Sequence, residues 1–207
     1  MTSILLIDTG SGNVHSARKA LIAAGAGSVE LTADPDAVRR AERLLLPGVG
    51  AFASCAARLR ARDGLEEAIL EAASGGTPLL GICVGMQLLA DEGFEHGRTR
   101  GLGLIPGVVR ALDAGSLRVP HMGWNEVAAQ RPHPLLPDPN VGAGHAYFVH
   151  SYRFAPTDAG DVAATCTYGE AFPALIARGN VAGTQFHPEK SQAYGLDLLS
   201  RFLRWSP

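Results

Sequence analysis

The chain has 207 residues, of which 46% are apolar and 18% are charged, and its formal charge is −2 at pH 7. A chain of this size and composition buries a sizeable core, so we expect a single domain over residues 1–207. The near-neutral charge provides no basic field for nucleic acid or for an anionic membrane surface. No apolar run approaches the roughly 20 residues that span a bilayer, and no leader pattern opens the sequence, which predicts a soluble, cytoplasmic protein.

The cysteines Cys55, Cys83 and Cys166 are widely spaced and form no C-x-x-C pair. This pattern indicates neither a disulfide framework nor a zinc site. The histidines also show no spacing typical of metal ligands. We therefore expect no metal and no cofactor.

Short apolar runs alternate with helical patterns through the first half of the chain. Strands are predicted at residues 4–7, 28–31, 44–46 and 78–82. Helices are predicted at residues 14–24, 51–60 and 65–73, and also where Asp34 and Pro35 form an N-cap and a first helical residue. Such alternation is typical of an α/β protein with a mostly parallel, doubly wound sheet and helices on both faces.

From residue 101 onward the sequence changes to short strands rich in glycine, proline and aromatic residues, and we expect an antiparallel extension of the sheet there. A last helix is predicted at residues 193–205. Active sites of parallel sheets lie beyond the carboxyl ends of the strands, which places Gly10, Pro47 and Cys83 at one edge.

Cys83 lies between Gly81 and Gly85, at the end of the apolar run 78–82. A strand that turns abruptly into a helix needs small residues at the corner and exposes the side chain there, so Cys83 is a candidate nucleophile. A packed core cysteine is the alternative for this segment alone. Free thiols have a pKa of about 8.5, and a neighbouring imidazolium makes such a nucleophile reactive near pH 7.

His187 and Glu189 flank Pro188 and therefore face one side of an extended segment. Taken singly, they also fit a turn histidine and a carboxylate at a helix N-terminus. Together with Cys83 they predict a Cys-His-Glu triad.

Acyl transfer also requires N–H donors for the developing oxyanion. The backbone N–H of Val84, directly after the nucleophile, is one candidate. The second is the peptide at Val49, in the segment 46–50, whose glycines permit a peptide flip; a plain strand-to-helix turn is the alternative. Loss of one donor costs about 2.7–4 kcal/mol, so a flipped peptide at Val49 acts as an off switch.

Two further segments are unusual for a plain core. Residues 119–125 place His121, Trp124 and Asn125 on a strand or its exit loop, which favours an interface, with a half-buried structural strand as the alternative. The glycine-rich turn at residues 8–13 is a weak indication of an anion site, and it lacks the spacing of a dinucleotide site.

These motifs together resemble the class-I (triad) glutamine amidotransferases, which are flavodoxin-like, and within them the glutaminase subunits of imidazole glycerol phosphate synthases. Residues 81–87 and 187–189 carry the general resemblance; residues 8–13, 46–52, 120–125 and 187–191 carry the narrower one. The resemblance implies that Cys83 attacks the side-chain amide of glutamine, that His187 is the general base and acid, and that Glu189 orients it. The implied glutamine-binding residues are Gly50, Gln87, Glu95, His150, Ser151 and Tyr152.

The same resemblance implies a partner that uses the ammonia. This partner is a (β/α)8-barrel cyclase subunit, joined in a heterodimer, which makes imidazole glycerol phosphate and aminoimidazole carboxamide ribotide in histidine biosynthesis. The implied interface residues are Asn13, His121, Met122, Trp124 and Lys190. Thr9 departs from the family pattern, which often has an aromatic residue at this position.

Other functions remain open from the sequence. One is a glutaminase for another synthase, such as that of pyridoxal phosphate or anthranilate, against which the segment 120–125 argues. Another is a catalytically silent subunit that reuses the fold, against which the intact Cys83, His187 and Glu189 argue. A third is a cysteine hydrolase or a glyoxalase-like stress protein, which needs neither Gln87 nor Glu189.

Overall fold

The computed structural model describes residues 2–10, 12–137 and 144–207. A nine-stranded sheet runs through the molecule in the order β2-β1-β3-β4-β13-β12-β11-β8-β9. Its parallel half comprises β2 (Ser28–Thr32), β1 (Ser3–Ile7), β3 (Leu44–Gly48), β4 (Leu79–Cys83) and β13 (Val181–Thr184). Its antiparallel half comprises β12 (Glu170–Arg178), β11 (Val162–Tyr168), β8 (His121–Ala129) and β9 (Gly144–His150).

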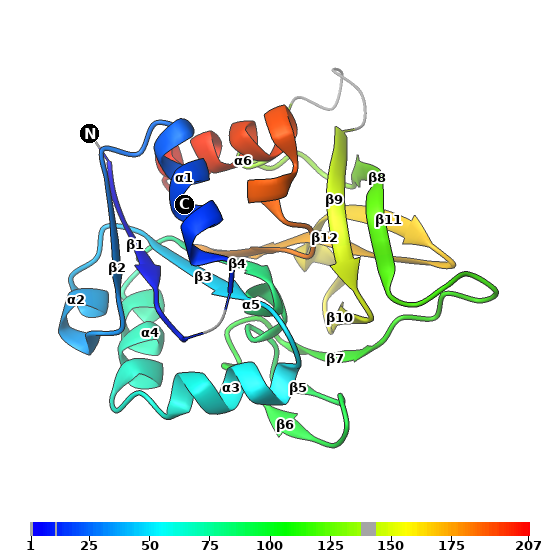
Figure 1. Cartoon of the computed structure of the whole chain (residues 1–207), viewed down its shortest axis with the longest axis horizontal. Coiled ribbons are helices and arrows are strands. Elements are labelled where there is room, and N and C mark those ends of the chain that lie inside the picture. Colours follow the sequence, from blue (N-terminus) through cyan, green and yellow to red (C-terminus); the bar gives the residue numbers. More distant parts are fainter. Residues whose placement is uncertain (1, 11, 138–143) are drawn as a thin grey trace.

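Helices cover both faces of the parallel half (Figure 1). On one face α1 (Val14–Ala23) packs against α6 (Gln192–Arg204); on the other lie α3 (Phe52–Arg60) and α4 (Leu65–Ser74), with α2 (Pro35–Arg39) beside α4. Strands β3 and β4 are buried at every position, as expected for parallel strands covered on both sides. The predicted α/β fold with an antiparallel extension is therefore confirmed.

Two helices begin at side-chain caps that the sequence shows. The Asp34 carboxylate accepts the N–H of Asp36 at 3.0 Å, one residue beyond Pro35 at the start of α2. Asn13 caps α1, where its Oδ1 accepts the N–H of Ser16 at 3.4 Å. Because each cap satisfies an N–H group that the helix leaves free, it fixes the residue at which the preceding loop ends.

A second sheet of four strands, in the order β10-β7-β5-β6, lies beside the antiparallel half. Its strands are β5 (Glu92–Gly93), β6 (Thr99–Arg100), β7 (Gly107–Ala111) and β10 (Tyr152–Pro156). The sequence analysis did not predict this separate sheet. Two of its strands have only two residues each, which is too short to show the alternation that identifies a strand.

Close backbone contacts join β3 and β4 to the short helix α5 (Val84–Gln87). A Cβ atom on Gly85 would lie 1.9 Å from the carbonyl oxygen of Leu46, and one on Gly48 would lie 2.5 Å from the Gly85 nitrogen. A Cβ on Gly81 would lie 2.6 Å from the Gly85 carbonyl oxygen. Any larger residue therefore pushes these elements apart, and the glycines bring residues 46–50 close to Cys83.

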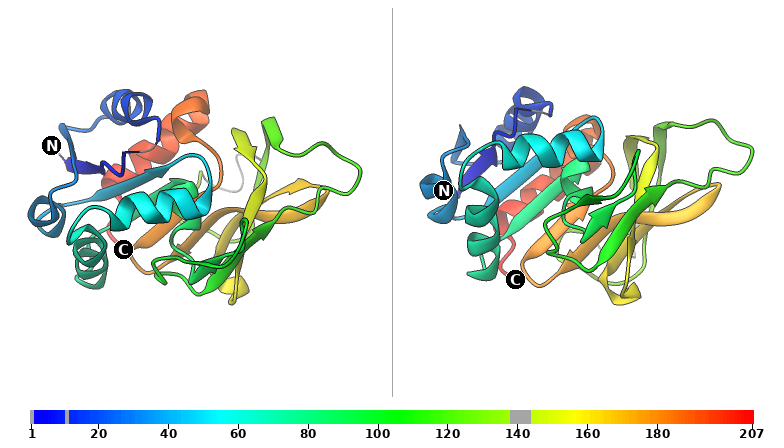
Figure 2. Two further views of the ribbon diagram at one scale, coloured as in Figure 1. Left: turned by 60° about the horizontal axis from the view of Figure 1, so that its bottom comes forward. Right: turned by 90° about the horizontal axis from the view of Figure 1, so that it is seen from below.

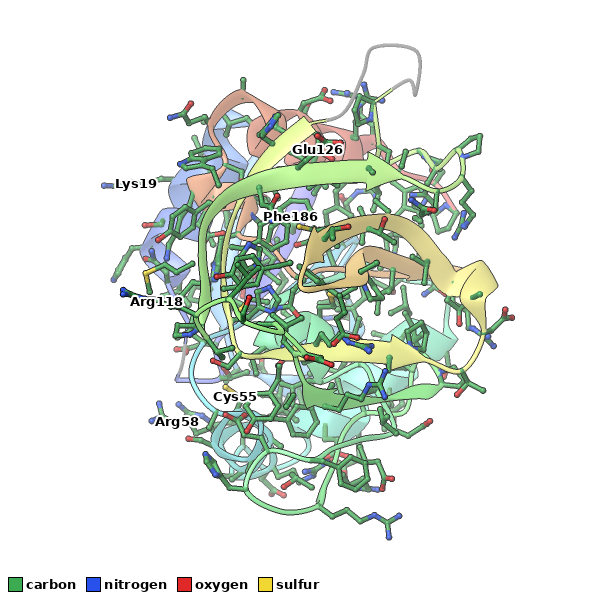
Figure 3. The ribbon with its side chains drawn as sticks, turned by 90° about the vertical axis from the view of Figure 1, so that its right-hand side faces the viewer. Lys19, Cys55, Arg58, Arg118, Glu126 and Phe186 are labelled. Atoms are coloured by element: carbon green, nitrogen blue, oxygen red, sulfur yellow. The ribbon has the colours of Figure 1, made fainter. Side chains whose placement is uncertain are left out.

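The antiparallel strands extend away from the helix-covered half, as the turned views show (Figure 2). A cluster of phenylalanines joins the two halves, with Phe148 edge-to-face against both Phe172 and Phe186 at ring-centroid distances of 5.8 Å. Phe186 lies in the interior, whereas Lys19 and Glu126 lie at the periphery (Figure 3). No helix within the described ranges is long and apolar enough to cross a membrane.

Candidate active site

A pocket of about 550 Å³ opens at the carboxyl ends of β3 and β4. Cys83 and His187 line it, together with Val49 and Val84. The structure also places all of the predicted glutamine-binding residues on its wall: Gly50, Gln87, Glu95, His150, Ser151 and Tyr152. Of the predicted interface residues, Asn13 and Lys190 line the same pocket.

Cys83 occupies the corner between β4 and α5 in a sparsely populated backbone conformation, with φ 55° and ψ −112°. A non-glycine residue in the left-handed region stores strain, and such strain is a feature of functional sites. The corner directs the thiol into the pocket while leaving Cys83 only 4% exposed. This geometry is that of a nucleophile on a sharp strand-to-helix turn.

His187 reaches the same edge because β13 runs parallel to β4, with Thr184 opposite Ile82. Its backbone N–H donates to the carbonyl of Tyr147 on β9 at 2.9 Å. Ser191 adds a second tie to the same strand, since its hydroxyl donates to the His187 carbonyl at 2.7 Å and accepts the Tyr147 N–H at 2.9 Å. The imidazole is thus fixed between the two halves of the sheet.

The Glu189 carboxylate lies in the short 3-10 helix η3 (Pro188–Lys190) and is 2.8 Å from Nδ1 of His187. Both side chains are buried. A carboxylate on Nδ1 fixes the ring orientation and leaves Nε2 for the reaction. The carboxylate oxygen Oε2 has no hydrogen-bond partner within the described part of the chain.

Three influences act on the pKa of His187. Burial lowers it, but the interactions with Cys83 and then with Glu189 outweigh burial and raise the pKa to about 9. Since Nδ1 faces Glu189, the thiol acts on Nε2, which forms no hydrogen bond with any described residue. The thiol and the ring are therefore close enough to interact but not hydrogen-bonded, as is common before substrate binds.

The Val49 segment has a contact that the sequence analysis missed. The Cys55 thiol, one turn into α3, donates to the carbonyl of Val49 at 3.2 Å. Val49 itself is 40% exposed and lines the pocket beside Gly50, which has φ +94°. Cys55 thus anchors the segment from which the second oxyanion donor was predicted.

Several residues predicted to bind glutamine already have protein partners, among them Glu95 and Gln87. The Glu95 carboxylate accepts the N–H of Phe52 at 2.6 Å and so caps α3 from outside that helix. The Gln87 amide nitrogen donates to the Tyr152 carbonyl at 2.9 Å and to Gln185 at 3.0 Å. Gln185 was assigned no role, although it lies two residues before His187 and so on the same side of the extended segment.

The predicted interface residues on β8 differ from one another. Met122 and Trp124 are exposed, at 62% and 49%. His121, in contrast, is only 2% exposed and packs between Phe148 and Tyr168, because successive residues of a strand point to opposite faces. The His121 side chain therefore points away from the exposed face that carries Met122 and Trp124, and its place at an interface stays a prediction.

The remaining predicted positions are also accounted for. The Lys190 ammonium lies over the Tyr147 ring, 5.5 Å from its centroid. Thr9 is buried, in the turn that follows strand β1. Ser11, within the glycine-rich turn, lies outside the described residues. In the part of the chain that the structure describes, no three His, Cys, Asp or Glu side chains gather to hold a metal ion.

The fold and the pocket define an α/β protein with a cysteine on a strand-to-helix corner and a histidine-carboxylate pair beside it. Residues 5–204 match the family described as glutamine amidotransferase class-I. The chain belongs to this family.

Its curated relatives share a narrower name. The chain is 51% identical over 215 residues to the imidazole glycerol phosphate synthase subunit HisH of Caulobacter vibrioides, with 100% of both proteins covered. It is 52% identical over 209 residues to the subunit of that name from Salinibacter ruber, with 98% of this chain and 93% of the relative covered.

Solved structures share the fold. A crystal structure of a glutamine amidotransferase superimposes with a TM-score of 0.75 at 20% identity, covering 97% of each chain. The structure of PurLQS from Thermotoga maritima matches with a TM-score of 0.76 at 20% identity, covering 98% of each chain.

Proposed function

We propose that this chain is the cytoplasmic glutaminase subunit of an imidazole glycerol phosphate synthase. It hydrolyses glutamine and passes the ammonia to a cyclase subunit. The observation that carries the proposal is the buried His187–Glu189 pair directed at Cys83, inside a pocket large enough for an amino acid. The full-length identity of about half to proteins named as subunits of that synthase supports the particular assignment.

In the first half-reaction the Cys83 thiolate attacks the side-chain carbonyl carbon of glutamine. The carbonyl π electrons move to the oxygen and form a tetrahedral oxyanion. His187 then gives its Nε2 proton to the amide nitrogen, the C–N bond breaks, and ammonia leaves a thioester on Cys83.

In the second half-reaction neutral His187 takes a proton from water, whose oxygen attacks the thioester carbon. Collapse of the second oxyanion breaks the C–S bond, which releases glutamate and restores the thiolate and the imidazolium. Glu189 stabilises the cationic ring in both half-reactions and does not itself take the proton.

The oxyanion is stabilised by the backbone N–H groups of Val84 and Val49. Val84 follows the nucleophile directly, and the glycine contacts described above bring the Val49 segment to the same side. Each such donor contributes about 2.7–4 kcal/mol to transition-state stabilisation. Cys55 acts on this step indirectly, because it holds the carbonyl of Val49.

Glutamine lies along the pocket wall with its ammonium group at Glu95, and with the backbone of Gly50 and of residues 150–152 around it. The negative charge of Glu95 complements the ammonium group of glutamine. The Glu95 carboxylate then accepts hydrogen bonds both from this ammonium and from the N–H of Phe52. Gln87 shapes the pocket wall and does not donate to glutamine, because both of its amide hydrogens are directed at protein oxygens.

The cyclase docks on the face that exposes Met122 and Trp124 and continues to Asn13 and Lys190 at the pocket rim. An exposed tryptophan and methionine at the centre of a patch are typical of a protein interface. Ammonia leaves through this mouth into the partner, a (β/α)8-barrel that makes imidazole glycerol phosphate and aminoimidazole carboxamide ribotide. The two subunits form a heterodimer.

The test is glutamate release from glutamine by the purified chain, alone and with the cyclase and its nucleotide ligand. We expect near-silence alone and strong stimulation by the loaded partner. Cys83→Ser should lower the stimulated rate by about 10⁴-fold or more, because the triad acts as a unit. Equal rates with and without the partner would indicate a free-standing glutaminase and contradict the assignment.

A further inference from the structure

A chain of buried polar groups begins at the nucleophile. The side-chain nitrogen of Gln185 lies 3.8 Å from Sγ of Cys83, whose thiol also faces the carbonyl oxygen of Val149 at 3.9 Å. The side-chain oxygen of Gln185 accepts the amide of Gln87 at 3.0 Å, so the Gln185 amide cannot flip without losing this bond. Gln87 in turn donates to the Tyr152 carbonyl at 2.9 Å.

Two buried histidines extend the chain from that carbonyl to β8. Nδ1 of His150 lies 2.9 Å from the Tyr152 oxygen, and Nε2 of His150 lies 3.0 Å from Nδ1 of His121. Nε2 of His121 lies 3.2 Å from the amide nitrogen of Asn125. The Asn125 amide is oriented by two backbone groups, since it donates to the Thr167 carbonyl at 3.0 Å and accepts the Glu126 N–H at 2.8 Å.

The partners at both ends determine the direction of every bond. A carbonyl oxygen only accepts, so Nδ1 of His150 carries a proton. Burial lowers the pKa of His150, and also that of His121, to about 4, so both rings are neutral at pH 7. Neutral His150 must then accept at Nε2, which requires His121 to donate from Nδ1 and to accept from Asn125 at Nε2. One tautomer of each ring satisfies all of these contacts.

This chain of hydrogen-bonded polar groups lies directly beneath the exposed patch on β8. His121 and Asn125 belong to the same strand as Met122 and Trp124, whose side chains point outward. The rings of Phe148 and Tyr168 enclose His121, with centroid distances of 4.9 Å and 4.1 Å. Displacement of this strand therefore moves a bonded neighbour of His150.

We propose that four residues are positioning residues: Gln185, Gln87, His150 and His121. Together they hold the Cys83 thiol in a fixed position relative to strand β8. The proposal rests on the proposed function and extends it to residues outside the triad. The Gln185 amide is fully buried, does not line the pocket, and directs an N–H at the sulfur. A hydrogen bond to a thiolate is stronger than one to a thiol, so this donor favours the reactive form.

The pH profile of Cys83 alkylation by iodoacetamide tests the chemical part of this proposal without any partner. Around the thiol, the titratable groups of the described residues are His187 with Glu189 behind it, and Glu95, Lys190, His150 and Tyr152 on the pocket wall. Burial raises the pKa of Cys166 to about 12, so that cysteine stays unreactive, and peptide mass spectrometry separates Cys55.

Gln185→Met keeps the side-chain volume and removes the donor. We expect the pH of half-maximal alkylation to rise by about one unit, so that the alkylation rate well below this pH falls about tenfold. Gln87→Met leaves the Gln185 amide free to turn and should shift the profile in the same direction by less. Gln130→Met, at an exposed strand end, is the matched control and should leave the profile unchanged.

Thermal unfolding identifies any variant that fails to fold. An unmoved profile in both folded variants, Gln185→Met and Gln87→Met, overturns the proposal. A purely structural role predicts a lower melting temperature without any shift of the pH midpoint.

His121→Phe tests the link to β8, because phenylalanine keeps the ring packing and removes both hydrogen bonds. In the complex with the cyclase we expect kcat for glutamine to fall about tenfold, with KM changed less than about twofold, because the thiol rather than the substrate is displaced. Tyr168→Phe is the matched control, since it alters the same aromatic cluster without touching the chain of bonds. Equal effects of the two variants overturn the link.

Failure of the proposed function is distinguishable. If the wild-type complex releases no glutamate but Gln185→Met still shifts the alkylation profile, the function is wrong and the positioning role stands. If the complex hydrolyses glutamine and the profile does not move, the positioning role is wrong.

Discussion

The two halves of the sheet differ in how they are buried and in what they carry. The parallel half is made of short, fully buried strands, and its glycines bring β3, β4 and α5 into backbone contact around Cys83. The antiparallel half has one face that packs on the core and another that exposes Met122 and Trp124. The first half holds the cysteine that we propose as the nucleophile, and the second carries the surface that we propose for the partner.

The comparison teaches where the two roles meet. His187 follows the last parallel strand, yet its backbone N–H and the side-chain hydroxyl of Ser191 are bonded to Tyr147 on the antiparallel strand β9. His187, which we propose as the base of the triad, is therefore held by both halves. A partner that moves the antiparallel strands acts on the triad through existing hydrogen bonds.

The largest expected effect concerns the packing of the parallel half. A Cβ in Gly85→Ala would meet the Leu46 carbonyl oxygen at 1.9 Å, so we expect the free energy of unfolding to fall by about 4 kcal/mol or more. Gly123→Ala is the control on β8, where nothing lies within 4 Å but φ is +133°. Only backbone strain of about 1–3 kcal/mol applies there. Urea unfolding measures the free energy of unfolding of both variants. Equal losses in the two variants would contradict the tighter backbone packing inferred for the parallel half.

A smaller effect is expected at the exposed face of the antiparallel half. Trp124→Ala should weaken binding to the cyclase by about 2 kcal/mol or more, a roughly 30-fold rise in Kd, while the stability of the isolated chain changes little. Calorimetric titration measures it. Leu31→Ala, on the edge strand of the parallel half, removes another exposed apolar side chain (39%) and should leave Kd unchanged. If both variants bind alike, the docking face lies elsewhere.

The parallel half was predictable because its signals are local. The cap at Asp34, the apolar run before Cys83 and the glycines at the corner each identify an element within a few residues. The predicted last helix at residues 193–205 differs from α6 by only one residue at each end. Local hydrogen bonds and short-range sterics set these features, so a single segment is enough to show them.

The antiparallel half and its buried contacts were not predictable in the same way. His121 was expected at the surface, since only the register of β8 with β9, which pairs His121 with His150, determines the face that it occupies. Gln185 and Cys55 act through side chains that meet partners far along the chain or within a helix. The separation of 102 residues between Gln185 and Cys83 leaves no local pattern to read.

Glu189 lies where the halves meet, and its removal gives a pH-dependent effect. The folded-state pKa of His187, about 9, lies above its ordinary value of 6.5. The folded state therefore holds this proton more tightly, and the resulting stability is complete below pH 6.5 and is lost as pH rises through 9.

We expect Glu189→Gln to destabilise the protein by about 1.5 kcal/mol at pH 6, because a charged hydrogen bond is lost, and the difference to vanish above about pH 9. Urea unfolding of both proteins across this range gives the difference directly. A gap between wild type and variant that grows with pH would show that the carboxylate does not stabilise a cationic ring.

The smallest effect belongs to the outer edge of the parallel half, at the opposite end of the sheet from β8 and β9. Asp34→Ala removes the cap of α2 and should cost about 1 kcal/mol of stability, whereas Asp34→Asn keeps a side-chain oxygen there and should cost little. Neither should change kcat of the complex, because α2 packs on α4 and not on the pocket. Chemical unfolding and glutaminase assays separate the two quantities. If Asp34→Ala lowered kcat in parallel with stability, this edge of the sheet would contribute to catalysis as well as to folding.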